Sequence, residues 1–157
     1  MTNQTKQDFT LRITQANKTD LIVILYEMTL AYLADAKDAY AARDYKGNRQ
    51  SLNHARACVN ELITSLDFHY EIAVSLLTLY IYLHKEMAKA ELEWDESHLD
   101  NAVKVAAALH IAWAQIAPQD ESAPLMENAE TVYTGMTYDR RQALGNYSPV
   151  ANRGFRV

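Results

Sequence analysis

Residues that break helices are almost missing from the long central part of this 157-residue chain. Between Ala16 and Ala117 the only glycine or proline is Gly47, whereas the three prolines and the other three glycines all follow residue 117. Because glycine and proline are the residues least compatible with a helix interior, a stretch without them is helical by default. The chain therefore divides into an N-terminal segment (1–15), a helical body (16–117) and a C-terminal extension (118–157).

Hydrophobic spacing divides the body into four helices. Apolar residues recur every three or four positions, as they do on one face of a helix. The first predicted helix runs from the N-cap Asn17 to near Arg43, and the second from the break at Asp44–Asn48 through Leu66. The third runs from about Tyr70 to Glu93. The fourth begins near Ser97, with Asp100 as its capping-box partner, and ends at residue 117. Four helices of this length with short links form an antiparallel up-down four-helix bundle, so the expected fold class is all-α.

The C-terminal extension differs in kind from the body. Ser122 followed by Pro124 predicts a short fifth helix over about 123–134, because proline is favoured in a first helical turn. Beyond Gly135 we expect a flexible, disordered tail.

Composition restricts the cellular compartments and the kinds of partner that suit this chain. Cys58 is the only cysteine, so an internal disulfide cannot form. The formal net charge of −5 and the lack of a basic stripe argue against nucleic-acid binding. No apolar run approaches the roughly 20 residues of a membrane span, so membrane insertion is not expected. The polar start of the chain is unlike a signal peptide, and we therefore expect a cytoplasmic protein.

Patterns for catalysis or metal binding are weak. A di-iron bundle needs repeated Glu-x-x-His motifs, and the comparable pair Asp95-x-x-His98 stands alone. His84 is the best candidate for a phosphotransfer histidine, although a surface or boundary imidazole is the commoner role. Ser65 and His69 lie four residues apart around a single aspartate, which is poor support for a catalytic triad. We therefore expect no enzymatic activity, no cofactor and no metal.

The first, third and fourth predicted helices carry more apolar surface than one side of a helix can bury. Six apolar or aromatic residues lie in a row between Asp20 and Glu27, and Ala106–Ala108 widen the apolar side of the last helix. Long apolar grooves of this kind suit a client that binds as an amphipathic helix. An empty groove favours aggregation. We therefore expect a segment to fold back over one groove in the free protein, either Phe9, Leu11 and Ile13 or the tail around Leu125 and Val132.

Two motifs in a fixed order indicate a family. Ala16-Asn17-Lys18-Thr19-Asp20-Leu21 leads into Leu25-Tyr26-Glu27-Met28, and Ser65-Leu66-Asp67 later precedes Leu79-Tyr80-Ile81-Tyr82. Over roughly residues 9–117 the chain resembles the flagellin export chaperone family, FliS, which typically shows Ala-Ser-Pro-Glu-Glu-Leu followed by Leu-Tyr-Asp-Gly. Met28 stands where the family has glycine, Ile81 where it has an acidic residue, and Phe9 in place of an N-terminal tyrosine.

The resemblance implies a monomeric or weakly self-associating bundle that captures the disordered C-terminal segment of flagellin. It would block premature polymerisation and deliver the subunit to the flagellar export apparatus. From the helical pattern, and for Tyr26, Leu66 and Tyr80 also from the family pattern, the client-binding groove is predicted at Ile22, Tyr26, Leu66, Phe68, Ile72, Leu76, Tyr80, Leu83, Val103 and Ala107. Phe9, Leu11 and Ile13 form the predicted autoinhibitory segment.

Two other functions remain open from the sequence. The first is a helical-bundle adaptor for another flagellar regulator or exported client. The second, more distant, is a histidine phosphotransfer domain that uses His84.

Overall fold

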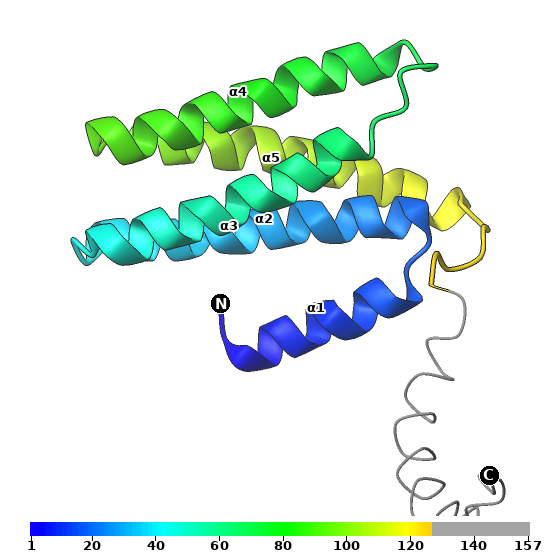
Figure 1. The fold of residues 1–157 in the computed structure, drawn as a ribbon, viewed down its shortest axis with the longest axis horizontal. Coiled ribbons are helices and arrows are strands. Elements are labelled where there is room, and N and C mark those ends of the chain that lie inside the picture. The colour runs from blue at the N-terminus through cyan, green and yellow to red at the C-terminus, as the bar shows by residue number, and fades with distance from the viewer. Residues whose placement is uncertain (127–157) are drawn as a thin grey trace, which may run out of the picture. The chain divides into compact units, whose positions relative to one another are not determined.

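The computed structural model describes residues 1–126, which form helices joined by short links, without strands in that range. Residues 127–157 are not described. Figure 1 shows the arrangement of the helices, whose bounds are α1 Asn3–Gln15, α2 Lys18–Ala41, α3 Tyr45–Thr64, α4 Ile72–Glu93 and α5 Glu96–Ile116, followed by the 3-10 turn η1 Ala117–Gln119. The all-α fold class predicted from the sequence is confirmed.

Helices α2 to α5 form the antiparallel up-down bundle. The ring of Trp94, in the turn between α4 and α5, lies 4.8 Å from the ring of Tyr40 and 4.1 Å from that of Tyr45. The α2–α3 turn and the α4–α5 turn therefore meet at one end of the bundle, and α2 and α4 run in the same direction. Trp94 closes this end with a left-handed backbone conformation (φ 50°).

Side-chain caps set the starts of three of the four bundle helices. Asn17 accepts a hydrogen bond from the backbone N–H of Asp20, whose carboxylate accepts one from Asn17 in return, so the predicted cap of the first bundle helix is confirmed. The next start differs from the prediction, because Asp44 caps α3 and Gly47 lies inside its first turn rather than in a break. A β-carbon at Gly47 would lie 2.2 Å from the Asp44 carboxylate, so glycine lets this cap close tightly.

The cap of α5 was also predicted wrongly. Asp95 is the N-cap and accepts from the backbone N–H of Ser97, whereas Asp100 pairs with Lys37 of α2 at 2.5 Å. A short polar residue favours a cap wherever it stands, so pattern alone could not choose between Asp95 and Ser97.

Two tyrosines meet in the centre of the core. The hydroxyl oxygens of Tyr26 and Tyr80 lie 2.6 Å apart, and both side chains are almost completely buried. Burial raises the pKa of both phenols above its ordinary value, so both stay protonated, and one hydroxyl donates a hydrogen bond to the other. Around them pack the other buried apolar residues of the bundle, including Leu33, Leu52, Val59, Leu62, Leu83, Met87 and Leu99.

Helix α1 lies along the outer side of α2 and covers its second apolar face. Phe9 is buried together with Ala16 and Ile24, and Ile13 and Met28 pack against this cluster. The sequence showed Phe9, Leu11 and Ile13 in alternation, but a helix brings Phe9 and Ile13 to one side and turns Leu11 to solvent, where it is 52% exposed. The excess apolar surface of α2 is therefore covered by the chain itself.

The predicted short fifth helix over about 123–134 lies mainly outside the described residues. Its first four residues, 123–126, are described and are not helical. Among residues 1–126, no helix is both long and apolar enough to cross a membrane.

Candidate functional site

The ten residues predicted for the client-binding groove do not lie together. Phe68 and Ile72 are exposed, and Leu66, Val103 and Ala107 are partly buried. The other five are buried in the bundle core: Ile22, Tyr26, Leu76, Tyr80 and Leu83. In this conformation the buried five can support a binding surface from below but cannot touch a client.

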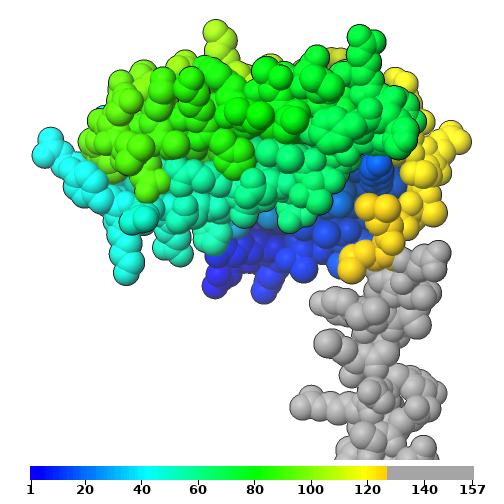
Figure 2. Space-filling view, turned by 45° about the horizontal axis from the view of Figure 1, so that its top comes forward, coloured from blue at the N-terminus to red at the C-terminus, as the bar shows by residue number. Residues whose placement is uncertain are grey.

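Large apolar side chains are exposed mainly on and just before α4. Of the fourteen exposed large hydrophobic residues among residues 1–126, eight belong to this region: Phe68, Tyr70, Ile72, Val74, Leu79, Ile81, Tyr82 and Leu92. Figure 2 shows that α4 (green) lies open at the surface along its length, beside α3 (cyan). The sequence signal for this surface was that apolar residues occur on α4 at more helical phases than a single buried side requires.

One flank of α4 borders α5, and the two helices share an exposed apolar surface. Glu86 of α4 accepts a hydrogen bond from Asn101 of α5 (2.9 Å), which identifies the facing sides of the two helices. Residues four, seven and fourteen positions before Glu86 return to the same side of α4, and residues four, seven, eleven and fifteen after Asn101 return to that side of α5. By helical spacing, this shared surface, here called the α4–α5 groove, is bordered by Ile72, Leu79 and Tyr82 on α4 and by Val105, Ala108, Ala112 and Ile116 on α5.

The small residues of this groove determine what can enter it. Ala108 and Ala112 are exposed, whereas the larger Ile72 and Ile116 stand at one end and are 64% and 49% exposed. Small side chains between larger ones allow the ridge of another helix to pack closely. Of the three alanines singled out in the sequence, Ala106 is fully buried, Ala107 is partly buried, and Ala108 alone is exposed.

The opposite flank of α4 is also apolar. Val74 and Ile81 are one heptad apart and both are more than half exposed. Arg56 of α3 donates to the backbone carbonyl of Met87 and to the carboxylate of Glu91, so α3 adjoins α4 on this flank through polar contacts. The two flanks together leave α4 with apolar surface on both sides of its buried stripe.

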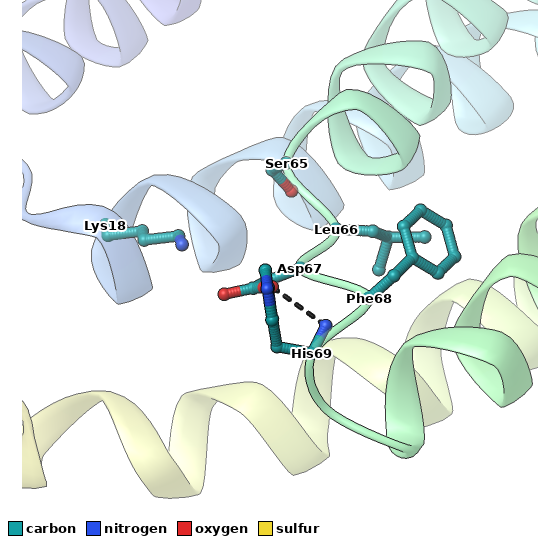
Figure 3. A pocket seen from close by; sticks show the side chains of 6 residues that line it. All are labelled: Lys18, Ser65, Leu66, Asp67, Phe68 and His69. Atoms are coloured by element: carbon teal, nitrogen blue, oxygen red, sulfur yellow. Dashed lines mark hydrogen bonds and ion pairs between the residues drawn. The ribbon is translucent and has the colours of Figure 1, made fainter.

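An open pocket of about 580 Å³ lies at the α3–α4 loop. Figure 3 shows Leu66 and Phe68 side by side on one side of the loop, while Asp67 and His69 lie together on the other, toward Lys18. The Asp67 carboxylate accepts from the His69 backbone and ring, which lowers the pKa of Asp67. Ser65 donates its hydroxyl to the carbonyl of Leu62 rather than to His69, so these residues do not form a catalytic triad.

A histidine–carboxylate cluster joins the ends of α4 and α5. His98 Nδ1 lies 2.8 Å from Glu86 Oε2, and His98 Nε2 lies 3.2 Å from Glu93 Oε2. The hydrogen bond with Glu86 raises the pKa of His98 above its ordinary value, although partial burial opposes the shift. Burial alone would raise the pKa of Glu86, but hydrogen bonds from Asn101 and His98 hold it below its ordinary value.

Because of this cluster, we expect the free energy of unfolding to depend on pH. The contribution of His98 is fully present below its unfolded pKa of about 6.5 and is lost as the pH rises through its raised folded pKa. The contribution of Glu86 is present above about pH 4.5 and is lost as the pH falls through its lowered folded pKa. We expect the stability difference between the wild type and His98→Gln to be largest near pH 5.5 and to shrink toward pH 8.5.

Urea denaturation at pH 5.5, 7.0 and 8.5 measures this difference in the free energy of unfolding. Parallel pH profiles for the two proteins would show that the imidazolium does not stabilise the α4–α5 end.

The other chemistry considered from the sequence was phosphotransfer at His84 and metal binding. His84 is partly buried, its Nε2 is enclosed without a hydrogen-bond partner among residues 1–126, and burial lowers its pKa, which does not suit an exposed phosphate acceptor. Within residues 1–126, three or more His, Cys, Asp or Glu side chains do not cluster as a metal site would require. Cys58 is buried, and burial raises its pKa to about 11.

Comparison with known proteins agrees with the resemblance seen in the sequence. A family model described as "Flagellar protein FliS" matches residues 1–120, which include all five α-helices and the α4–α5 groove. Curated individual proteins gave no match. The match covers well over half of the chain, and the chain therefore belongs to the FliS family of flagellar export chaperones.

Proposed function

We propose that this protein binds the C-terminal segment of flagellin, which is disordered before assembly, and holds it until export. Binding would keep the segment from polymerising early in the cytoplasm, and the complex would deliver the subunit to the flagellar export apparatus. The observation that carries the proposal is the open apolar surface on both flanks of α4, next to a bundle core that is already filled.

The thermodynamics of a disordered client require a surface of this kind. Ordering a segment of roughly 30 residues costs about 1–2 kcal/mol per residue in backbone entropy alone. Coupled folding and binding typically buries about 1,000–3,000 Å², at roughly 25 cal/mol per Å² of apolar area. A single small pocket cannot supply that area, whereas a groove along a helix of 22 residues can. We assign the central part of the client site to the α4–α5 groove.

The surface of α2 under α1 is a second site for the client in this proposal. Phe9 and Ile13 occupy it in the free protein, and Arg12 reinforces the contact by donating to Glu27 at 2.5 Å. His110 of α5 lies 3.5 Å from the other oxygen of the same carboxylate, so Glu27 links α1 to α5 through a single group. A client helix of similar pattern would displace α1, which makes α1 the autoinhibitory segment. Leu11, which faces solvent, would not contribute.

Calorimetry with a flagellin C-terminal peptide tests the proposal directly. We expect saturable one-to-one binding with a negative heat-capacity change, which is the signature of apolar burial. A peptide from the flagellin N-terminal end is the matched control and is expected not to bind. An absence of heat with the C-terminal peptide, together with binding of another flagellar protein, would favour the adaptor function instead.

Hydrogen exchange with and without the peptide tests the role of α1. We expect the amides of α1 to lose protection when the peptide binds, because α1 leaves α2, while the amides of α4 and α5 gain it. Equal protection of α1 in the two states would show that α1 is a permanent part of the bundle.

A further inference from the structure

A segment from the far end of the described chain crosses the joint between α1 and α2. Residues 117–125, here called the strap, begin with η1 at the end of α5 and run back to the start of α2. The Leu125 N–H donates to the carbonyl of Ala16 at 2.9 Å, and the Thr19 hydroxyl donates to the Asp120 carboxylate at 2.5 Å. These contacts join positions about one hundred residues apart in sequence.

Asn17 holds the α2 cap and the strap at the same time. Its side-chain oxygen accepts from the Asp20 N–H to cap α2, while its amide nitrogen donates to the strap carbonyls of Asp120 (3.0 Å) and Ser122 (3.5 Å). The side chain is buried, so both ends of the amide are used by the protein. A cap alone would need only the oxygen, which is why the nitrogen contacts indicate a separate role.

The strap is itself held in a defined shape. Ser122 donates both its backbone N–H and its hydroxyl to the Asp120 carboxylate. Those bonds, with the one from Thr19, lower the pKa of Asp120 to about 2, so the carboxylate is charged at every physiological pH. Leu125 lines a mainly apolar pocket of about 270 Å³ together with Leu21, Ile22 and Leu25 of α2.

The joint that the strap crosses is where α1 would have to pivot. Ala16 and Asn17 are both extended and are the only two residues between α1 and α2. Rotation at these residues would swing α1 away from α2, and α1, which is held helical mainly by that packing, would then fray and expose its amides to exchange. While the strap is bound, the Ala16 carbonyl and the Asn17 side chain are both fixed, and that rotation is opposed.

We propose that the strap is a latch that controls the opening of α1, so that α1 leaves α2 readily only after the strap has been released from Asn17 and Thr19. The latch acts on the free protein. Its consequence for client binding, a slower association while the strap is closed, rests on the function proposed above.

The test is hydrogen exchange on the full-length protein without any client. In the variant Asn17→Asp the cap remains, because aspartate is an equally good N-cap, but the donor to the strap is lost. Combined with Thr19→Val, which removes the hydroxyl without changing the shape of the side chain, it should release the strap. We expect the α1 amides to exchange about tenfold faster, while the core amides of α3 and α5 stay unchanged.

Thr78→Val is the matched control, because the Thr78 hydroxyl bonds only the carbonyl of Val74 within its own helix. It should leave α1 exchange unchanged. Unchanged α1 exchange in the double variant, despite faster exchange at the Leu125 amide, would overturn the latch. An equal acceleration throughout the bundle would also overturn it, since the strap would then be a general brace.

A second measurement uses the flagellin C-terminal peptide. If the wild type binds the peptide, the double variant should associate faster with little change in the dissociation rate. Equal association rates would overturn the link between latch and client. If the wild type does not bind the peptide, the proposed function fails, and the exchange experiment still decides whether the latch exists.

Discussion

The variant Ala108→Glu is expected to weaken binding of the flagellin C-terminal segment about 100-fold, or roughly 3 kcal/mol. Ala108 is exposed on the α5 side of the α4–α5 groove, where a small side chain lets a client helix approach. Glutamate would fill that space and place a charge that must lose its water when the client binds. Glutamate also favours helix, so α5 should stay folded.

Ala57→Glu on α3 is the control for this variant. It makes the same chemical change at an exposed helical alanine, one turn from Asn53 and one turn from Glu61, on a polar part of the surface. Isothermal calorimetry gives the two affinities, and circular dichroism checks that both variants are folded. If Ala108→Glu bound as tightly as Ala57→Glu, the client would have to use the Val74 and Ile81 flank of α4, and the assignment of the groove would be wrong.

The variant Tyr80→Ala is expected to lower the free energy of unfolding by about 3–5 kcal/mol, the usual range for truncating a buried aromatic side chain. Tyr80 is 1% exposed, and its loss would leave a cavity and remove the hydrogen bond between its hydroxyl and that of Tyr26. A loss of this size is a large fraction of the total stability of a typical domain.

Tyr80→Phe keeps the ring and isolates the hydroxyl. It should cost only about 1–2 kcal/mol, and affinity for flagellin should change by less than about twofold, because the hydroxyl faces Tyr26 and not the surface. Urea denaturation and calorimetry measure the two quantities. A large loss of affinity in Tyr80→Phe at unchanged stability would restore Tyr80 as a client contact.

The two tyrosines show where prediction from sequence ended. The sequence predicts Tyr26 and Tyr80 in the groove from the helical pattern and because both match the family pattern. Helical spacing shows which residues share a side of a helix, but it cannot choose the inward side when two sides are apolar. On α4 the seam that contains Leu76 and Leu83 faces the core, and the phases of Leu79 and Ile81 remain outside.

The prediction of the N-terminal segment from the sequence was limited for a different reason. Residues 3–15 are polar enough that their intrinsic pattern predicts little, and their helix is stabilised mainly by packing Phe9 and Ile13 against α2. The partner surface on α2 was visible in the sequence as an unusually long apolar run, yet its occupant was not. The strap gave even less signal, because its hydrogen bonds use backbone carbonyls and common polar side chains.

The sequence by itself determined the helical class, the number of helices in the bundle, the cap at Asn17 and the family. Each of these depends on local signals: the absence of glycine and proline, the three-and-four spacing, and short motifs in order. Only the tertiary structure decided which apolar sides are buried, that α1 covers α2, and that residues 120–125 close over the joint between them. Those outcomes depend on contacts between residues far apart in the chain, and their free energy is gained only when the helices have packed.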